Sequence, residues 1–98
     1  MIMIQINYTN KDRILEISGH AGYAEKGSDI VCAAVTALAG TLERCMEEAG
    51  EGSCEWKEGE TRFTASGTEN LRPCFETVVT GLRMLAEEFP DYVRTKEI

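Results

Sequence analysis

Apolar and polar residues alternate along the first part of the chain. The apolar residues of segment 2–8 lie at every second position, and segment 13–19 resumes the alternation with Leu15 and Ile17. A period of two puts such side chains on one face of a strand. We therefore expect two strands joined by a turn at residues 9–12, which together form a β-hairpin.

The spacing changes to that of a helix at residue 30. Apolar residues then recur at steps of four and three, at Val31, Val35, Leu38, Leu42, Cys45 and Ala49. This stripe is typical of an amphipathic helix, which we expect over residues 30–49. Ser28 or Asp29 is the expected N-cap, and Gly50 is the expected C-terminal stop.

The second half repeats the plan of a hairpin followed by a helix. Segments 53–57 and 61–66 predict two strands, with Cys54 and Trp56 facing the same layer as Phe63 and Ala65. A second helical stripe comprises Leu71, Phe75, Val78, Leu82, Leu85 and Phe89. This stripe predicts a second amphipathic helix from about residue 70 to residue 89.

Polar and small residues mark the limits of this second helix. Asn70 is a plausible cap, and Pro73 is tolerated because it falls in the first turn, where the missing N–H would be unpaired anyway. Gly81 in the middle suggests close packing against another element. Pro90 ends the helix, and segment 92–95 can add a last strand. The elements predict an α/β two-layer sandwich, a mostly antiparallel five-stranded sheet with two helices on one face.

The composition is that of a globular chain forming one domain over residues 1–98. Hydrophobic residues make up 43% and charged residues 28% of the sequence, which excludes a disordered chain. No apolar run approaches the roughly 20 residues of a membrane-spanning helix. The N-terminal segment lacks a positively charged region and a cleavage site. We expect a cytoplasmic protein without membrane attachment.

The net charge of −7 indicates which class of binding partner to expect. A nucleic acid is not expected, because there is no excess of Lys and Arg to neutralise phosphates. An acidic surface instead favours a basic partner, although such charge also serves solubility alone.

The four cysteines have no CxxC spacing and no secretory context, so they are expected to be thiols. With a single histidine and no closely spaced cysteine pair, neither a structural zinc ion nor another cofactor is expected. Cys45, Cys54 and Cys74 lie beside apolar residues and are interpreted as packing residues.

Candidate chemistry gathers in residues 19–35, GHAGYAEKGSDIVCAAV. His20 follows a strand, and Cys32 falls in the first turn of the expected helix. If Asp29 is the N-cap, Cys32 is the third helical residue, where unpaired N–H groups and the helix dipole favour a thiolate. A neighbouring imidazole can then take the proton, as acyl transfer requires. On the residues alone, packing or surface roles are the commoner explanation for such a cysteine and histidine.

The segment resembles the motif of the ribosomal-processing cysteine protease family, Prp. The resemblance rests on GHA, a short loop and then G-x-D-I-V-C-A-A, with the element order agreeing along the whole chain. Thr36 departs from it, because relatives commonly carry serine there, although the hydroxyl is kept. The resemblance implies His20 and Cys32 as the catalytic pair, Asp29 and Thr36 as supporting residues, and a homodimer.

The resemblance also implies the substrate, a large-subunit ribosomal protein (L27 type) with a hydrophobic N-terminal extension that the enzyme removes. Gly22 and Gly27 would let the intervening loop order over that substrate. Two alternatives stay open: a non-enzymatic ribosome-associated assembly protein, and a thiol redox sensor built on Cys32.

Overall fold

The structure is a computed structural model, and it describes residues 1–8, 12–66 and 69–97. Seven elements follow one another in the predicted order: β1 (Ile2–Tyr8), β2 (Asp12–Ser18), α1 (Ile30–Ala49), β3 (Ser53–Lys57), β4 (Glu60–Ser66), α2 (Arg72–Glu88) and β5 (Val93–Glu97). Within the described residues, no helix is long and apolar enough to cross a membrane.

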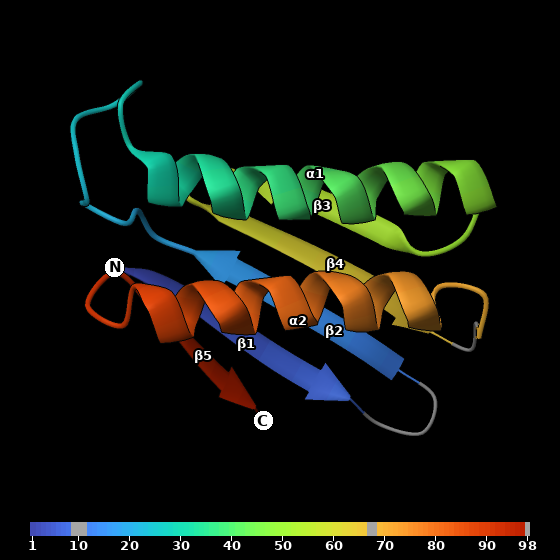
Figure 1. Ribbon diagram of the computed structural model, residues 1–98. Coiled ribbons are helices and arrows are strands. Elements are labelled where there is room, and N and C mark those ends of the chain that lie inside the picture. Colours follow the sequence, from blue (N-terminus) through green and yellow to red (C-terminus); the bar gives the residue numbers. More distant parts are fainter. Residues whose placement is uncertain (9–11, 67–68, 98) are drawn as a thin grey trace.

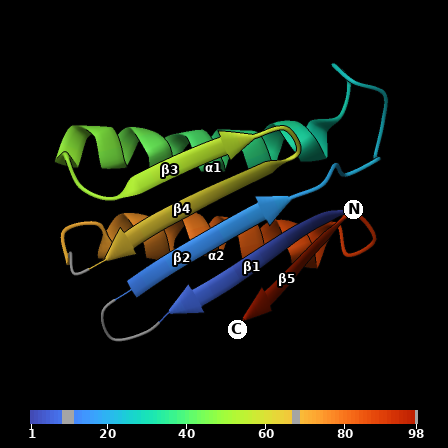
Figure 2. The ribbon, with the colours of Figure 1, turned by 180° about the vertical axis from the view of Figure 1, so that it is seen from behind.

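The strands form one five-stranded sheet in the order β3-β4-β2-β1-β5. Three neighbouring pairs are antiparallel, and β1 pairs with β5 in parallel. Both helices lie on the same face, α1 over the β3–β4 side and α2 over the β2–β1 side (Figures 1 and 2). This confirms the predicted two-layer α/β sandwich.

The alternation of buried and more exposed residues along the strands explains how the helix layer packs on the sheet. Ile2, Ile4 and Ile6 of β1 are buried, whereas Tyr8 at its end is exposed. The inner face continues across β2 and β4 with Leu15, Ile17, Phe63 and Ala65. Removing these side chains from water, at about 25 cal/mol per Å² of apolar area, is the main force that holds the helices on the sheet.

Helix α1 begins and ends as its sequence predicts. Asp29 is the N-cap, and Gly50 ends the helix in the left-handed conformation with φ of 67°. The apolar stripe was only partly right, because Ala39 and Met46 face the core where Cys45 and Ala49 were expected. The helix packs on two partners, so its buried surface is divided between the sheet and α2.

Helix α2 starts without the predicted cap. Asn70 donates its side-chain amide to Glu51, and Leu71 takes the N-cap position with no side-chain capping bond. Pro73 lies in the first turn as predicted. Gly81 confirms the expected close packing, since an added Cβ would lie 3.0 Å from Leu38 Cδ2.

Turn limits also differ slightly from prediction. Asp12 opens β2 rather than closing the first turn, whose remaining residues 9–11 lie outside the described part of the chain. Glu60 belongs to β4, so the second hairpin turns over two residues. The last strand is longer than expected, because pairing with β1 extends it to Glu97.

Candidate active site

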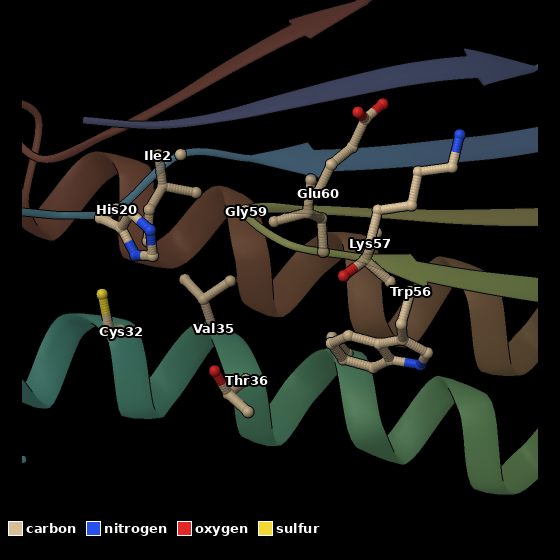
Figure 3. Close-up of a pocket in the computed structure, with 13 residues that line it drawn as sticks. Ile2, His20, Cys32, Val35, Thr36, Trp56, Lys57, Gly59 and Glu60 are labelled. Carbon is tan, nitrogen blue, oxygen red and sulfur yellow. The ribbon is translucent and has the colours of Figure 1, made fainter.

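A cavity of about 190 Å³ opens between the first half of α1 and the end of the sheet where β3 turns into β4. His20 and Cys32 both line it, and the Cys32 sulfur points toward the His20 imidazole (Figure 3). Val35 and Thr36 of α1 continue the same wall. The fold thus brings the two predicted chemical groups, 12 residues apart in sequence, to one cavity.

Backbone geometry around Cys32 fits a negatively charged sulfur. Cys32 is the third residue of α1, in the turn where helical N–H groups lack helical partners. In addition, the Ala21 N–H donates to Cys32 Sγ at 3.3 Å. A backbone N–H and a helix N-terminus both stabilise an anion. Cys32 is partly exposed, so reagents and substrates can reach it.

Asp29 connects the helix to the preceding loop. Its Oδ1 accepts the Cys32 N–H at 2.9 Å, and its Oδ2 accepts the N–H groups of Tyr23 at 3.1 Å and Ala24 at 3.4 Å. These backbone donors, the Cys32 N–H first, lower the pKa of the Asp29 carboxyl from its ordinary value. Asp29 therefore positions the cysteine and the loop, rather than orienting the imidazole through a hydrogen bond.

His20 is held through its backbone. The Met1 nitrogen donates to the His20 carbonyl oxygen at 2.6 Å, and the Gly19 N–H donates to the Gly59 carbonyl at 2.9 Å. Gly19 has φ of 89°, and a Cβ there would lie 2.4 Å from the Met1 carbonyl oxygen. Only glycine fits this position. No hydrogen bond joins the imidazole to Cys32 in the part of the chain that the structure describes.

The loop between His20 and Asp29 is exposed beyond Ala21 and has one aromatic anchor. Tyr23 packs edge-on against Phe89 and Tyr92, with ring centroids 5.7 and 5.1 Å apart. Gly22 and Gly27 have φ of 68° and 92°, the left-handed region that favours glycine. Neither would bring a Cβ into contact with other atoms, so their role is conformational.

The far wall of the cavity is aromatic and charged. Trp56 of β3 lines it, remains 50% exposed, and packs edge-on against Phe63. The Trp56 indole N–H donates to the Glu43 carboxylate, which fixes the ring from α1. Lys57 and Glu60 extend outward from the same rim (Figure 3).

The remaining cysteines lie away from this cavity, and the surroundings of Cys54 and Cys74 disfavour a thiolate. Burial raises the pKa of Cys54 to about 12, helped by a hydrogen bond to the nearby Glu43 carboxylate. Burial and a hydrogen bond with Cys45 raise the pKa of Cys74 to about 12. Cys32 is therefore the cysteine best placed for chemistry at the cavity.

The arrangement can supply a sulfur nucleophile, a nearby imidazole and backbone N–H donors, which are the groups that acyl transfer needs. In residues 1–8, 12–66 and 69–97, no three His, Cys, Asp or Glu side chains gather as metal ligands would. Sequence reasoning missed the Ala21 N–H and the Trp56–Glu43 pair. An exposed tryptophan on an edge strand was the available signal for the latter.

Comparisons with known proteins show which proteins this chain is similar to. A family model described as cysteine protease Prp matches residues 1–94. A structure of the ribosomal processing protease Prp from S. aureus, with a covalently linked product peptide, is 21% identical with a TM-score of 0.88; each chain is covered completely. A second structure of that protease, with a substrate peptide, is 20% identical with a TM-score of 0.74, again over both complete chains.

SMU.848 from Streptococcus mutans is also similar in structure, at 27% identity and a TM-score of 0.76, covering all of this chain and 94% of its own. A comparison with curated proteins gave no match. The structural likenesses show the shared fold, and the family model spans nearly the whole chain.

Proposed function

Because this chain belongs to the Prp family of cysteine proteases, we propose that it removes the N-terminal extension of a large-subunit ribosomal protein of the L27 type. His20 and Cys32 act as the catalytic dyad. One observation carries the proposal: the only histidine of the sequence and a first-turn cysteine line one cavity, and the Ala21 N–H is directed at the sulfur. Two similar structures that contain product or substrate peptides support a peptide substrate.

The proposed reaction has two half-steps. His20 takes the proton from Cys32 Sγ, and the thiolate attacks the scissile carbonyl carbon while first-turn N–H groups of α1 stabilise the oxyanion. The tetrahedral intermediate collapses as His20 protonates the leaving amine, which gives a thioester. His20 then deprotonates a water molecule, whose attack on the thioester releases the extension and restores the thiol.

Asp29 and Thr36 support this pair. Asp29 holds the Cys32 backbone and the loop through its three accepted N–H groups. Thr36 lies one turn after Cys32 and also lines the cavity. Its hydroxyl can contact the substrate backbone beside the nucleophile, a role that Thr36→Ser would keep and Thr36→Val would lose in a cleavage assay.

The loop between the catalytic residues is proposed to order over the substrate. Gly22 and Gly27 absorb the backbone change, and Tyr23 anchors the loop in the absence of substrate. Amide hydrogen exchange of residues 21–28 should slow when a substrate peptide binds the Cys32→Ala variant. Equal exchange with and without peptide would contradict loop ordering.

Charge and surface fit a basic protein with an apolar extension. The cavity offers apolar contacts from Ile2, Val35 and Trp56, and the net charge of −7 attracts a basic ribosomal protein over a longer range. Added salt should slow cleavage of the full-length substrate and leave a short neutral peptide unaffected. Equal salt dependence of the two would contradict electrostatic steering.

The same proposal includes a homodimer in the cytoplasm that requires neither nucleic acid nor membrane. A cytoplasmic enzyme meets newly made ribosomal proteins, and a strongly negative chain repels nucleic acid. Sedimentation equilibrium should give twice the mass of the chain. A monomer mass at micromolar concentration would contradict the dimer, and cell fractionation tests the location.

The decisive experiment incubates the protein with an extended L27-type ribosomal protein and measures product masses. The wild type should remove the extension, Cys32→Ala should cleave nothing, and His20→Ala should slow cleavage by about 100-fold or more. Cys45→Ala is the matched control, because it removes a cysteine of the same helix away from the cavity. An unchanged substrate mass with the wild type, or full cleavage by Cys32→Ala, would defeat the proposal.

A further inference from the structure

Two cysteines meet between the helices, at the end of the molecule remote from the cavity. Cys45 of α1 and Cys74 of α2 are both half-buried, and their thiols are near enough to interact. Cys45 lies 13 residues beyond Cys32, which is roughly 20 Å along the helix axis. The pair therefore belongs to a different environment from the catalytic site.

The register of the two helices explains this meeting. The helices run antiparallel (Figure 1), and Leu38 of α1 packs directly on Gly81 of α2. Seven residues forward on α1 and seven back on α2 lead from that contact to Cys45 and Cys74. Because two turns return a helix to nearly the same face, the second position repeats the close approach of the first.

We propose that Cys45 and Cys74 form a reversible disulfide when the protein meets a peroxide, so that this dithiol is an oxidation site separate from the catalytic cysteine. The step needs little rearrangement, because the two thiols already interact and the helices that carry them approach closely at Gly81. Disulfide formation requires such preset proximity of the two backbones.

The chemistry divides between the two thiols. Cys74 retains its proton, so Cys45 attacks the peroxide. The Cys45 sulfur becomes a sulfenic acid, and the O–O bond of the peroxide breaks to release water. Cys74 then attacks the sulfenic sulfur, the S–S bond forms, and the leaving hydroxide takes the Cys74 proton to give a second water. Two thiols are oxidised by two electrons, and one peroxide is reduced. A dithiol reductant reverses the disulfide.

The bond would close a loop that contains the whole β3–β4 hairpin. Such a cross-link restricts the unfolded chain, so the oxidised form should melt at a higher temperature than the reduced form. The first turn of α1 lies at the other end of the helix and should be unaffected. The rate of proteolysis per intact Cys32 thiol should thus be the same with or without the cross-link.

The test treats the full-length protein with hydrogen peroxide and maps unreduced tryptic peptides by mass spectrometry. We expect a cross-linked peptide pair containing Cys45 and Cys74, lighter by two hydrogen atoms, and its loss on reduction with dithiothreitol. Cys45→Ala and Cys74→Ala should each abolish it. The matched controls Cys54→Ala and Cys32→Ser should retain it.

Three results would overturn the proposal. One is oxidation of Cys45 to a sulfinic acid in a protein with intact circular dichroism while Cys74 stays a free thiol. Another is a cross-link that lowers the melting temperature, since that would mean that the folded state does not hold the pair together. The third is intermolecular cross-linking in place of the intramolecular pair.

Discussion

The two ends of helix α1 hold cysteines in opposite surroundings. At the first turn, Cys32 faces an open cavity and receives the Ala21 N–H on its sulfur. Thirteen residues later, Cys45 is half-buried and interacts with Cys74 of α2, whose pKa is raised to about 12. The same side chain on one helix thus faces an open cavity at one end and a second cysteine at the other.

The difference shows that the local electrostatic environment, more than the residue type, determines whether a thiol can act as a nucleophile. Backbone N–H groups and the positive end of the helix dipole surround Cys32. Near the other end, the carboxylate of Glu43 hydrogen-bonds Cys54, and burial raises the pKa of that thiol to about 12. Negative charge and burial both penalise a thiolate.

Thiol labelling should give the largest contrast between these ends. With iodoacetamide at pH 7.5, Cys32 should react first, and Cys54 and Cys74 about 1,000-fold more slowly, because a pKa of about 12 leaves so little thiolate. Peptide mass spectrometry over time measures each rate. In about 8 M urea, which unfolds the protein, all four cysteines should react alike. Equal labelling rates in the folded protein would contradict the difference between the two thiol environments.

Glu43→Gln sharpens the same measurement. The amide still accepts the Trp56 indole N–H but carries no charge, so Cys54 should react faster than in the wild type. The gain should be smaller than the gain on unfolding, because burial is the larger cause of the raised pKa. No change in the Cys54 rate would show that the carboxylate has no part in it.

The caps of α1 provide the next contrast. Asp29→Ala removes the acceptor of three N–H groups, so it should lower kcat/KM between about 10-fold and 100-fold through misplacement of Cys32, and it should also lower stability. Gly50→Ala at the opposite end forces a left-handed Ala, which also lowers stability by about 1 kcal/mol. Its kcat/KM should stay unchanged, and a loss there would contradict the separation of the two ends.

Acid pH tests the Asp29 cap independently. The pKa of Asp29 is lowered in the folded protein, so its stabilisation is present above the ordinary carboxyl range and is lost as the pH falls through the lowered value. The stability difference between wild type and Asp29→Asn should therefore shrink below about pH 4. Urea unfolding at neutral and acid pH measures it. A constant difference would mean that the charge of Asp29 has no stabilising effect.

Trp56 links the two regions, because Glu43 in the middle of α1 holds a ring that lines the cavity. Trp56→Ala should raise KM for an apolar peptide about 5-fold, with little change in kcat, since a lost apolar contact is worth on the order of 1 kcal/mol. Trp56→Phe keeps the apolar surface and should restore most of the binding. A fall in kcat alone would show that Trp56 acts on the chemistry instead.

Much of the fold follows from sequence periodicity, because burial of one face is a local requirement. The limits of α1 and its Gly50 stop were confirmed, and of the two expected caps, Ser28 and Asp29, the structure shows Asp29. The buried stripe was less accurate at Cys45, since periodicity cannot show that a helix divides its apolar surface between a sheet and a second helix. Asn70 does not cap α2, because its side-chain amide donates to Glu51, a residue distant in sequence.

The site was predictable only in its side chains. The position of Cys32 on the helix was readable from the N-cap, and its cavity with His20 then emerged from the fold. The Ala21 N–H contact could not be predicted, because every residue type except proline carries a backbone N–H and its direction depends on the path of the loop. The parallel pairing of β1 with β5 was likewise undetermined, since strand order depends on how α2 crosses the sheet.

Substitutions at two glycines test how closely the middle of α1 is packed on α2, and they have the smallest expected effect. Gly40→Ala adds a Cβ that meets nothing within 4 Å, so it should raise stability by about 0.5–1 kcal/mol through helix propensity alone. Gly81→Ala gains the same propensity but presses on Leu38 at 3.0 Å. Overpacking costs about 1–3 kcal/mol, so we expect a net loss of about 1 kcal/mol.

Urea unfolding of both glycine variants measures this contrast, and Leu38→Ala in the Gly81→Ala background is the control that relieves the clash. The close approach at Gly81 also sets the helix register that brings Cys45 to Cys74. Gly81→Ala should therefore slow formation of their disulfide, whereas Gly40→Ala should not. If both variants gained the same stability and oxidised equally fast, the two helices would be too loosely packed to hold those thiols together.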